Sequence, residues 1–143
     1  MSLRVARMLA AALPLLLAAG PRAAAGAEDK TAAAVQAGAG WLALVDGGKY
    51  AESWSEASEI FRGSVPEARW VELAGATRKP LGKLLARKLT SKTYSTSLPG
   101  APDGEYVVVQ YASSFTDKKA AVETVSLMKE KDGRWKVAGY FVR

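Results

Sequence analysis

The spacing of apolar residues changes once along this chain, near Gly82, and divides the sequence into two unlike halves. Before Gly82, apolar side chains recur every three or four residues, which is the period of one face of a helix. After it, β-branched and aromatic residues become frequent and are separated by turns rich in proline and glycine, which is typical of strands in hairpins. We therefore expect an α+β domain with its helices first and an antiparallel sheet second.

Three helices are expected in the first half. The first covers residues 28–46, and the second covers residues 50–63, where aromatic and alanine side chains share one face. The third begins at Ser64 and continues to about Lys79, because Ser64 and Glu67 have the spacing of a capping box, in which each side chain bonds the other residue's amide.

Four strands are expected in the second half, over residues 84–97, 105–115, 120–130 and 134–142. The segment 84–97 has an alternative: its leucines, with Leu81, also fit one face of a helix. Short connections between consecutive strands predict sequential hairpins. The expected fold is three helices packed on one face of a curved four-stranded antiparallel meander.

The first 27 residues have the features of a secretory signal peptide. Arg4 and Arg7 precede an apolar run over residues 8–19, and small residues suitable for cleavage follow near Ala25 and Ala27. The run is shorter than the roughly 20 apolar residues that span a membrane. We expect cleavage near Ala25 or Ala27, which leaves one domain over residues 28–143 in the periplasm or outside the cell.

The exported part has no cysteine, so its hydrophobic core must stabilise it without disulfides. Loss of the leader would lower the formal net charge from +6 to +3, which is small for binding a phosphate backbone, and no recognition helix or base-stacking motif is present. Nucleic acid is therefore not an expected partner.

Several segments of the exported part resemble one bacterial family. They are residues 41–46 (WLALVD), 78–82 (RKPLG), 98–106 (LPGAPDGEY), 121–124 (AVET) and 133–135 (GRW). The family is the exported domain of unknown function 4019 (DUF4019). The resemblance implies a Gram-negative envelope setting and a cone-shaped fold similar to cystatins or nuclear transport factor 2, and it implies no activity.

The composition excludes several kinds of chemistry. With no histidine and no cysteine, the chain lacks the commonest general base, thiol nucleophiles and the usual zinc and haem ligands. The glycines at 38 and 40 fall within a helical pattern and lack the spacing of a phosphate-binding loop. We expect no cofactor and no metal.

Glu123 is the candidate catalytic residue that remains. In a strand it shares a face with Ala121, Val125 and Leu127, so its carboxylate has either lost its hydration or found a cation partner. As a general base it would act with tyrosine donors in an isomerase or dehydratase. As an ion-pair partner it would be structural, and this second interpretation is favoured.

Aromatic residues provide a candidate pocket, because they are numerous enough to line an apolar cavity with polar edges. The candidate lining residues are Trp41, Tyr50, Trp54, Tyr106, Tyr111 and Tyr140. Tyr106 and Tyr111 lie on opposite faces of one expected strand, so both sheet faces carry aromatic area. A homodimer or a protein partner on the outer face of the sheet is therefore expected.

Cations are concentrated between Glu72 and Asp103, a stretch without an acidic residue. They are Arg78, Lys79, Lys83, Arg87, Lys88 and Lys92. They suit contact with an anionic envelope surface, although lysines on an edge strand also prevent aggregation. Together these features favour a non-catalytic binding or interaction module that takes a protein partner or a small apolar ligand; the alternative is the isomerase or dehydratase.

Overall fold

The computed structural model describes residues 29–143, so the expected signal peptide lies outside the described residues. The elements are α1 (Ala32–Asp46), α2 (Tyr50–Glu56), α3 (Glu59–Ser64), α4 (Glu67–Arg78), the short 3-10 helix η1 (Lys79–Leu81), β1 (Leu84–Ser95), β2 (Tyr106–Phe115), β3 (Lys118–Lys129) and β4 (Trp135–Val142). The α+β class is confirmed, and the helical half ends at Gly82 as predicted.

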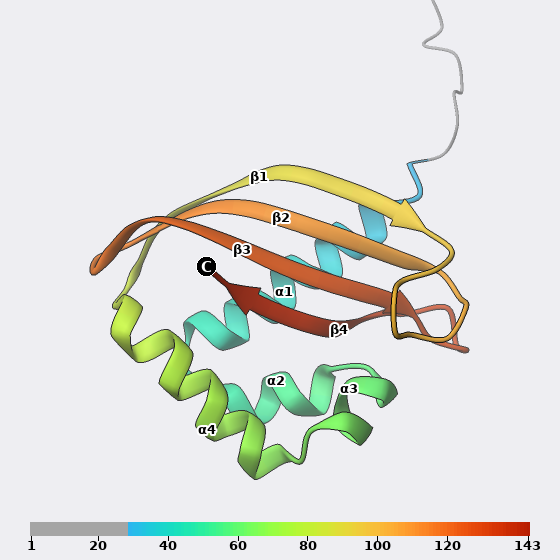
Figure 1. Ribbon diagram of the computed structural model, residues 1–143, viewed down its shortest axis with the longest axis horizontal. Helices are drawn as coiled ribbons and strands as arrows, with labels where there is room; N and C mark the ends of the chain where they lie inside the picture. Colours follow the sequence, from blue (N-terminus) through green and yellow to red (C-terminus); the bar gives the residue numbers. More distant parts are fainter. Residues whose placement is uncertain (1–28) are drawn as a thin grey trace, which may run out of the picture.

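The four strands form one antiparallel sheet in the order β1-β2-β3-β4 (Figure 1). Leu84–Ser95 is a strand along its whole length, so the helical alternative for this segment is wrong. Register shifts after Leu89 in β1 and after Ser126 in β3 mark bulges, which bend a sheet and increase its twist. Gly82 turns the chain into the sheet with a φ of 77°, a conformation that favours glycine.

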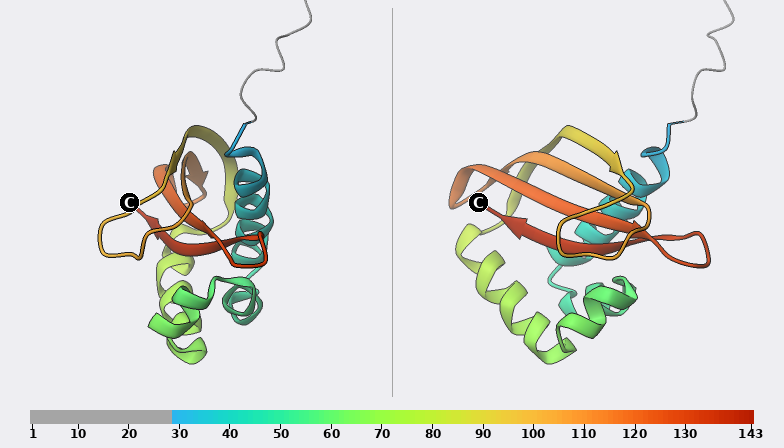
Figure 2. Two further views of the ribbon diagram at one scale, coloured as in Figure 1. Left: turned by 90° about the vertical axis from the view of Figure 1, so that its right-hand side faces the viewer. Right: turned by 45° about the vertical axis from the view of Figure 1, so that its right-hand side comes forward.

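Helix α1 packs against one face of this sheet, here called the inner face (Figure 2). Its apolar side chains and those of alternate strand positions are fully buried together, including Leu42, Val45, Val109 and Val125. Gly38 brings the helix close to β3, because a Cβ at this position would lie 3.4 Å from a methyl group of Leu127. In Figure 1, α1 crosses behind the sheet, so the reader faces the opposite, outer face.

Residues 29–143 contain four α-helices where three helices were predicted, because the second predicted helix is interrupted at Ala57 and Ser58. Both residues are extended, with ψ values of 168° and 157°. The Ser58 amide donates to the Val137 carbonyl of β4 at 2.8 Å. The Ser58 hydroxyl accepts from the Phe61 amide, so it caps α3. The sheet therefore takes a hydrogen bond that a continuous helix would have used.

The capping box predicted at Ser64 and Glu67 is wrong. Ser64 is the last residue of α3, and its hydroxyl donates to the Ile60 carbonyl at 2.7 Å. Pro66 is the N-cap of α4, with no side-chain capping bond. The spacing was correct for a capping box, but Ser64 belongs to the preceding helix and its hydroxyl bonds a carbonyl of that helix.

The outer face of the sheet is partly covered by the chain itself. Tyr106 points outward from β2, yet it is 1% exposed because its hydroxyl donates to the Pro102 carbonyl in the loop over residues 98–104. Phe141 of β4 is the aromatic residue that stays open on this face, with 54% of its surface exposed. No helix within residues 29–143 has the length and apolarity needed to cross a membrane.

Candidate functional site

Glu123 lies on the inner face of β3 and is completely buried. Its Oε1 accepts from Arg87 Nε at 2.7 Å and from the Ser113 hydroxyl at 2.5 Å. Its Oε2 accepts from Arg87 Nη2 at 3.1 Å and from the Tyr140 hydroxyl at 2.5 Å. Three strands thus supply donors to one carboxylate, and the arginine contact is bidentate, which is the strongest common form of this pair.

Arg87 also connects β1 to the end of α1. Its Nη1 and Nη2 donate to the two carboxylate oxygens of Asp46 at 2.8 and 2.9 Å, and Arg78, the last residue of α4, donates to Asp46 at 2.8 Å. We call Asp46, Arg78, Arg87 and Glu123 the ion cluster. Two cations and two anions balance within it, and it ties the ends of two helices to the sheet.

The ionisation of neighbouring groups reflects this arrangement. Burial opposes the charged form of Asp46, but hydrogen bonds from Arg87 and Arg78 outweigh it and lower the pKa of the carboxyl. Burial likewise opposes the Arg87 charge, and its bonds to Asp46 and Glu123 raise the pKa of the guanidinium. Burial and the Glu123 charge both raise the pKa of the Tyr140 hydroxyl, which stays protonated as a donor.

Some buried polar atoms in and beside the ion cluster have no hydrogen-bond partner within residues 29–143. Arg78 Nε and Nη1 and the Tyr111 hydroxyl are buried without a hydrogen-bond partner within residues 29–143. The Arg78 guanidinium carbon instead lies 5.0 Å from the centre of the Phe115 ring, a cation–π contact. The unpartnered Arg78 and Tyr111 atoms are hydrogen-bond donors in the interior of the protein. The Glu123 carboxylate beside them already accepts four hydrogen bonds and is not exposed to solvent.

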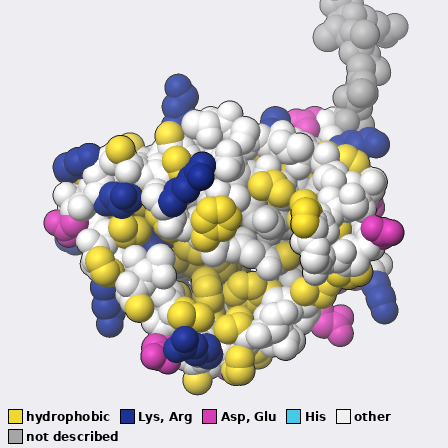
Figure 3. All heavy atoms as spheres, viewed as in Figure 1, with side chains coloured by type: hydrophobic (Ala, Val, Ile, Leu, Met, Phe, Trp, Pro, Cys, Tyr) yellow, Lys and Arg dark blue, Asp and Glu magenta, His cyan; other side chains and the backbone are white. Residues whose placement is uncertain are grey.

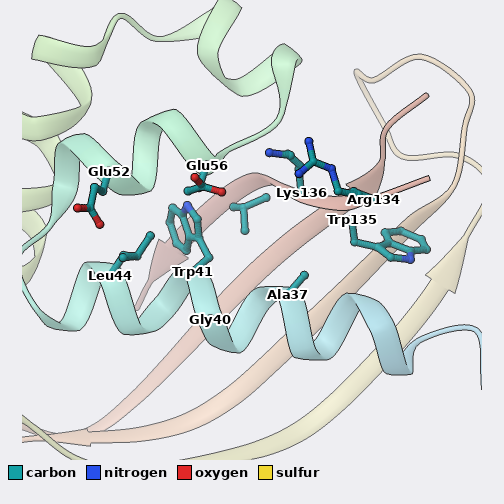
Figure 4. Close-up of a pocket in the computed structure, with 10 residues that line it drawn as sticks. Ala37, Gly40, Trp41, Leu44, Glu52, Glu56, Arg134, Trp135 and Lys136 are labelled. Atoms are coloured by element: carbon teal, nitrogen blue, oxygen red, sulfur yellow. The ribbon is translucent and has the colours of Figure 1, made fainter. Parts of the chain in front are cut away.

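A groove opens on another side of the molecule, between α1, α2 and the start of β4 (Figure 4). Its cavity volume is about 460 Å³. The lining residues are Ala37, Gly40, Trp41, Leu44, Glu52, Glu56, Arg134, Trp135, Lys136 and Val137. Apolar residues of α1 and β4 form its floor, glutamates of α2 stand on one wall, and Arg134 and Lys136 stand on the other (Figure 4).

Gly40 keeps the floor of this groove open. A glycine inside a helix destabilises the helix by about 1 kcal/mol relative to alanine, so a glycine at this position is expected to have a packing or functional reason. Gly38, two residues earlier in the same helix, has a packing reason in its contact with Leu127. A Cβ at Gly40 would meet no atom within 4 Å. No neighbouring atom in residues 29–143 therefore requires a glycine at this position.

The family model described as protein of unknown function (DUF4019) matches residues 37–140, which run from α1 through β4. The chain belongs to the DUF4019 family. The matched segment contains the ion cluster and all the residues that line the groove. No curated protein matches the chain.

The aromatic residues predicted to line one pocket are dispersed in this DUF4019 domain. Trp41 lines the groove, although its indole N–H is occupied by the Ser53 carbonyl at 2.8 Å. Tyr140 belongs to the surroundings of the ion cluster, and Tyr106 lies beneath its loop. The other three, Tyr50, Trp54 and Tyr111, pack in or against the hydrophobic core.

The predicted cations separate into three groups. Arg78 and Arg87 are drawn into the ion cluster, with side-chain exposures of 6% and 14%. Lys92 pairs with Asp29 at 2.9 Å. Lys79, Lys83 and Lys88 remain exposed, and no ion pair between residues 29 and 143 includes them.

Sequence reasoning missed most of the groove. Arg134 and Trp135 belong to segment 133–135, which carries the family resemblance but was assigned no part in a pocket, and Glu52, Glu56 and Lys136 were not among the candidate residues. One signal was present: the glycine at 40 sits within a strong helical pattern, where it weakens the helix.

Proposed function

We propose that this DUF4019 domain is a non-catalytic binding domain whose groove between α1, α2 and β4 takes a small ligand with an apolar body and polar groups. The observation that carries the proposal is Gly40, which leaves the groove floor open at a cost to α1 and without a packing reason. A concave site with an apolar floor and a few polar groups at its walls is the usual form of a small-molecule site.

The walls of the groove restrict the ligand further. Glu52 and Glu56 lie one helical turn apart on α2, and Arg134 and Lys136 face them from the start of β4. Opposite charges on facing walls favour a ligand that carries a positive and a negative group separated by an apolar segment. The partly exposed Trp135 ring offers flat apolar surface to that segment, whereas Trp41 is 4% exposed and only closes the floor.

The alternative, an isomerase or dehydratase with Glu123 as base, has less support. A general base must reach the proton that it abstracts, within a hydrogen bond of the substrate. Glu123 is completely buried, and both of its oxygens already accept two hydrogen bonds. Its surroundings fit the ion-pair interpretation instead.

We propose further that the domain is exported to the periplasm or beyond, on the strength of the leader in residues 1–27. A relation to the cystatin-like or nuclear transport factor 2-like cone folds belongs to the same proposal. A bent antiparallel sheet with α1 on its inner face supports that relation.

Native mass spectrometry of the protein recovered from the periplasmic fraction of cells that export it tests these proposals together. We expect one small molecule to be retained per protein. The measured protein mass should match a chain that begins just after Ala25 or Ala27. The Gly40→Leu variant should lose the small molecule, because the new side chain occupies the groove floor. It should not lose stability, because leucine is the better helix former by nearly 1 kcal/mol.

Ala39→Leu is the matched control, because Ala39 is exposed on the same helix and does not line the groove. It should retain the ligand as the parent protein does. Equal retention by the parent, Gly40→Leu and Ala39→Leu would show that the ligand lies elsewhere. A parent protein without any retained molecule would contradict the groove proposal.

A further inference from the structure

A second groove lies on the outer face of the sheet, far in sequence from the first. Its cavity volume is about 520 Å³. Small residues of three strands form most of its lining, and they are Ala86, Ala112, Ser113, Ser114, Ala120, Ala121 and Val122. Ala112 is exposed although β2 is an interior strand of the sheet, because no larger side chain and no helix of residues 29–143 covers it.

Strand register places cations at both ends of one row across this groove. Lys88 pairs with Ala112, and Ala112 pairs with Val122. The Val122 amide donates to the Arg143 carbonyl at 2.9 Å, and the Arg143 amide donates back at 3.1 Å. Residues directly opposite in a sheet share a face, so Lys88 and Arg143 flank two small residues, with about 14 Å between their backbones at roughly 4.8 Å per strand.

A third cation, Lys119, lines the same groove near the hairpin between β2 and β3. Figure 3 shows lysine and arginine side chains gathered over this part of the outer face. No aspartate or glutamate lines the groove, and no ion pair within residues 29–143 uses Lys88, Lys119 or Arg143. Arg87 also touches it, but its charge is already balanced by Glu123 and Asp46.

We propose that this outer groove binds the acidic headgroup of a membrane lipid. Lys88, Lys119 and Arg143 would surround the headgroup phosphate, and the alanine floor leaves room for it at the backbone. Protection of an edge strand explains a lysine in β1, but it does not explain further cations from β3 and from the residue after β4 around the same hollow.

Two exposed apolar residues favour a bilayer over a free anion. Leu85 lies at the register shift between Leu84 and Ala86, where the regular alternation of faces is interrupted next to the groove residue Ala86, and it is 55% exposed. Phe141 lies on the outer face two residues before Arg143 and is 54% exposed. Cations beside exposed large apolar side chains match the headgroup layer of an anionic membrane, where phosphates meet acyl chains. This site shares no residue with the groove at Gly40, so a negative result for one proposal does not affect the other.

Cosedimentation with lipid vesicles tests the inference. The protein is mixed at about 0.1 M salt with vesicles of phosphatidylcholine alone or of phosphatidylcholine with phosphatidylglycerol. We expect binding to the phosphatidylglycerol vesicles that exceeds binding to the neutral ones. The double variant Lys88→Gln with Lys119→Gln should bind them roughly 25-fold more weakly, since each cation near an anionic surface contributes about fivefold.

The double variant Lys49→Gln with Lys131→Gln is the matched control. It has the same net charge and removes two exposed lysines that do not line the outer groove. It should retain binding within about twofold, because distant charges are screened at this salt concentration. All variants keep the same N-terminus, so any membrane affinity of the leader cancels in the comparison.

Three results would overturn the inference. The first is equal weakening in both double variants, which would indicate a general effect of net charge. The second is binding to neutral vesicles as strong as to anionic ones. The third is calorimetric binding of soluble glycerol phosphate as tight as vesicle binding and unaffected by Phe141→Ser, which would assign the site to a free phosphate. Weaker vesicle binding by Phe141→Ser supports the lipid.

Discussion

At the scale of single residues, Glu123 shows how a completely buried acid is held by an ion pair and hydrogen bonds. Its carboxylate is ionically paired with Arg87 and receives hydroxyl hydrogen bonds from Ser113 and Tyr140. Such a group is stable only while all partners are present, because an unpaired charge in the interior loses its hydration without compensation. The same contacts that make it structural occupy the lone pairs that a base would use.

Replacing this acid should therefore reduce stability strongly. We expect Glu123→Gln to lower the free energy of unfolding by about 3 kcal/mol, and the melting temperature by more than about 10 °C, because Arg87 loses one of its two charge partners. Thermal unfolding followed by circular dichroism measures this change.

Glu105→Gln is the control for that substitution. Glu105 also faces a cation, Lys129 at 3.6 Å, and accepts from the Tyr94 hydroxyl, but its side chain is 44% exposed. Its loss should change the free energy of unfolding by less than about 1 kcal/mol. A Glu123→Gln protein as stable as the parent would contradict the structural role and would support the alternative in which Glu123 transfers a proton.

At the scale of elements, the break between α2 and α3 depends on the sheet. The helical pattern of residues 50–63 is continuous, yet the Ser58 amide bonds the Val137 carbonyl of β4 and the chain extends there. Ser58 then serves as the N-cap of α3. A local pattern describes which face is apolar, but it does not describe a competing hydrogen bond from a strand that lies 79 positions later.

Two serines at the ends of α3 test this account. Ser58→Ala should lower the free energy of unfolding by about 1 kcal/mol, because the Phe61 amide loses its cap. Ser64→Ala should change it by less than about 0.5 kcal/mol, because the exposed Ser64 hydroxyl only bonds back to a carbonyl of its own helix. Urea unfolding measures both values. The reverse order would indicate that Ser64 caps α4 after all.

At the scale of the whole molecule, the ion cluster joins both layers of the fold. Asp46 closes α1, Arg78 closes α4, and Arg87 and Glu123 come from β1 and β3. Tyr140 adds β4 through its hydrogen bond to Glu123. Stability of the complete domain should therefore follow the protonation of groups in and around this cluster.

High pH should reveal that dependence. Burial raises the pKa of Tyr140 and of Tyr111 above the ordinary value of 10.0. The folded protein then holds protons that the unfolded chain releases, so their contribution to stability is complete below about pH 10 and falls as the pH rises above it. We expect Tyr140→Phe to be less stable than the parent at pH 8 by about 2 kcal/mol, from the lost bond to a charged acceptor.

That difference should narrow above pH 10, by up to about 1.4 kcal/mol per pH unit, because only the parent loses the Tyr140 contribution. Thermal unfolding of both proteins from pH 8 to about 11.5 measures the gap. Other titrating groups are common to the two proteins and cancel. A gap that stays constant across this range would show that Tyr140 ionises in the folded protein as readily as in the unfolded chain.

Short-range patterns in the amino-acid sequence were sufficient for the class of the fold, the transition at Gly82 and the four strands in meander order. These properties depend on periodicity and turn residues within a few positions of one another. Long-range register decided the rest. It interrupted the second helix at Ser58, drew Arg78 and Arg87 inside while Lys88 stayed outside, and aligned Lys88 with Arg143 across three strands. Strand pairing and bulges set which side chains meet, and a one-residue shift reverses every face, so local spacing alone carries no record of those contacts.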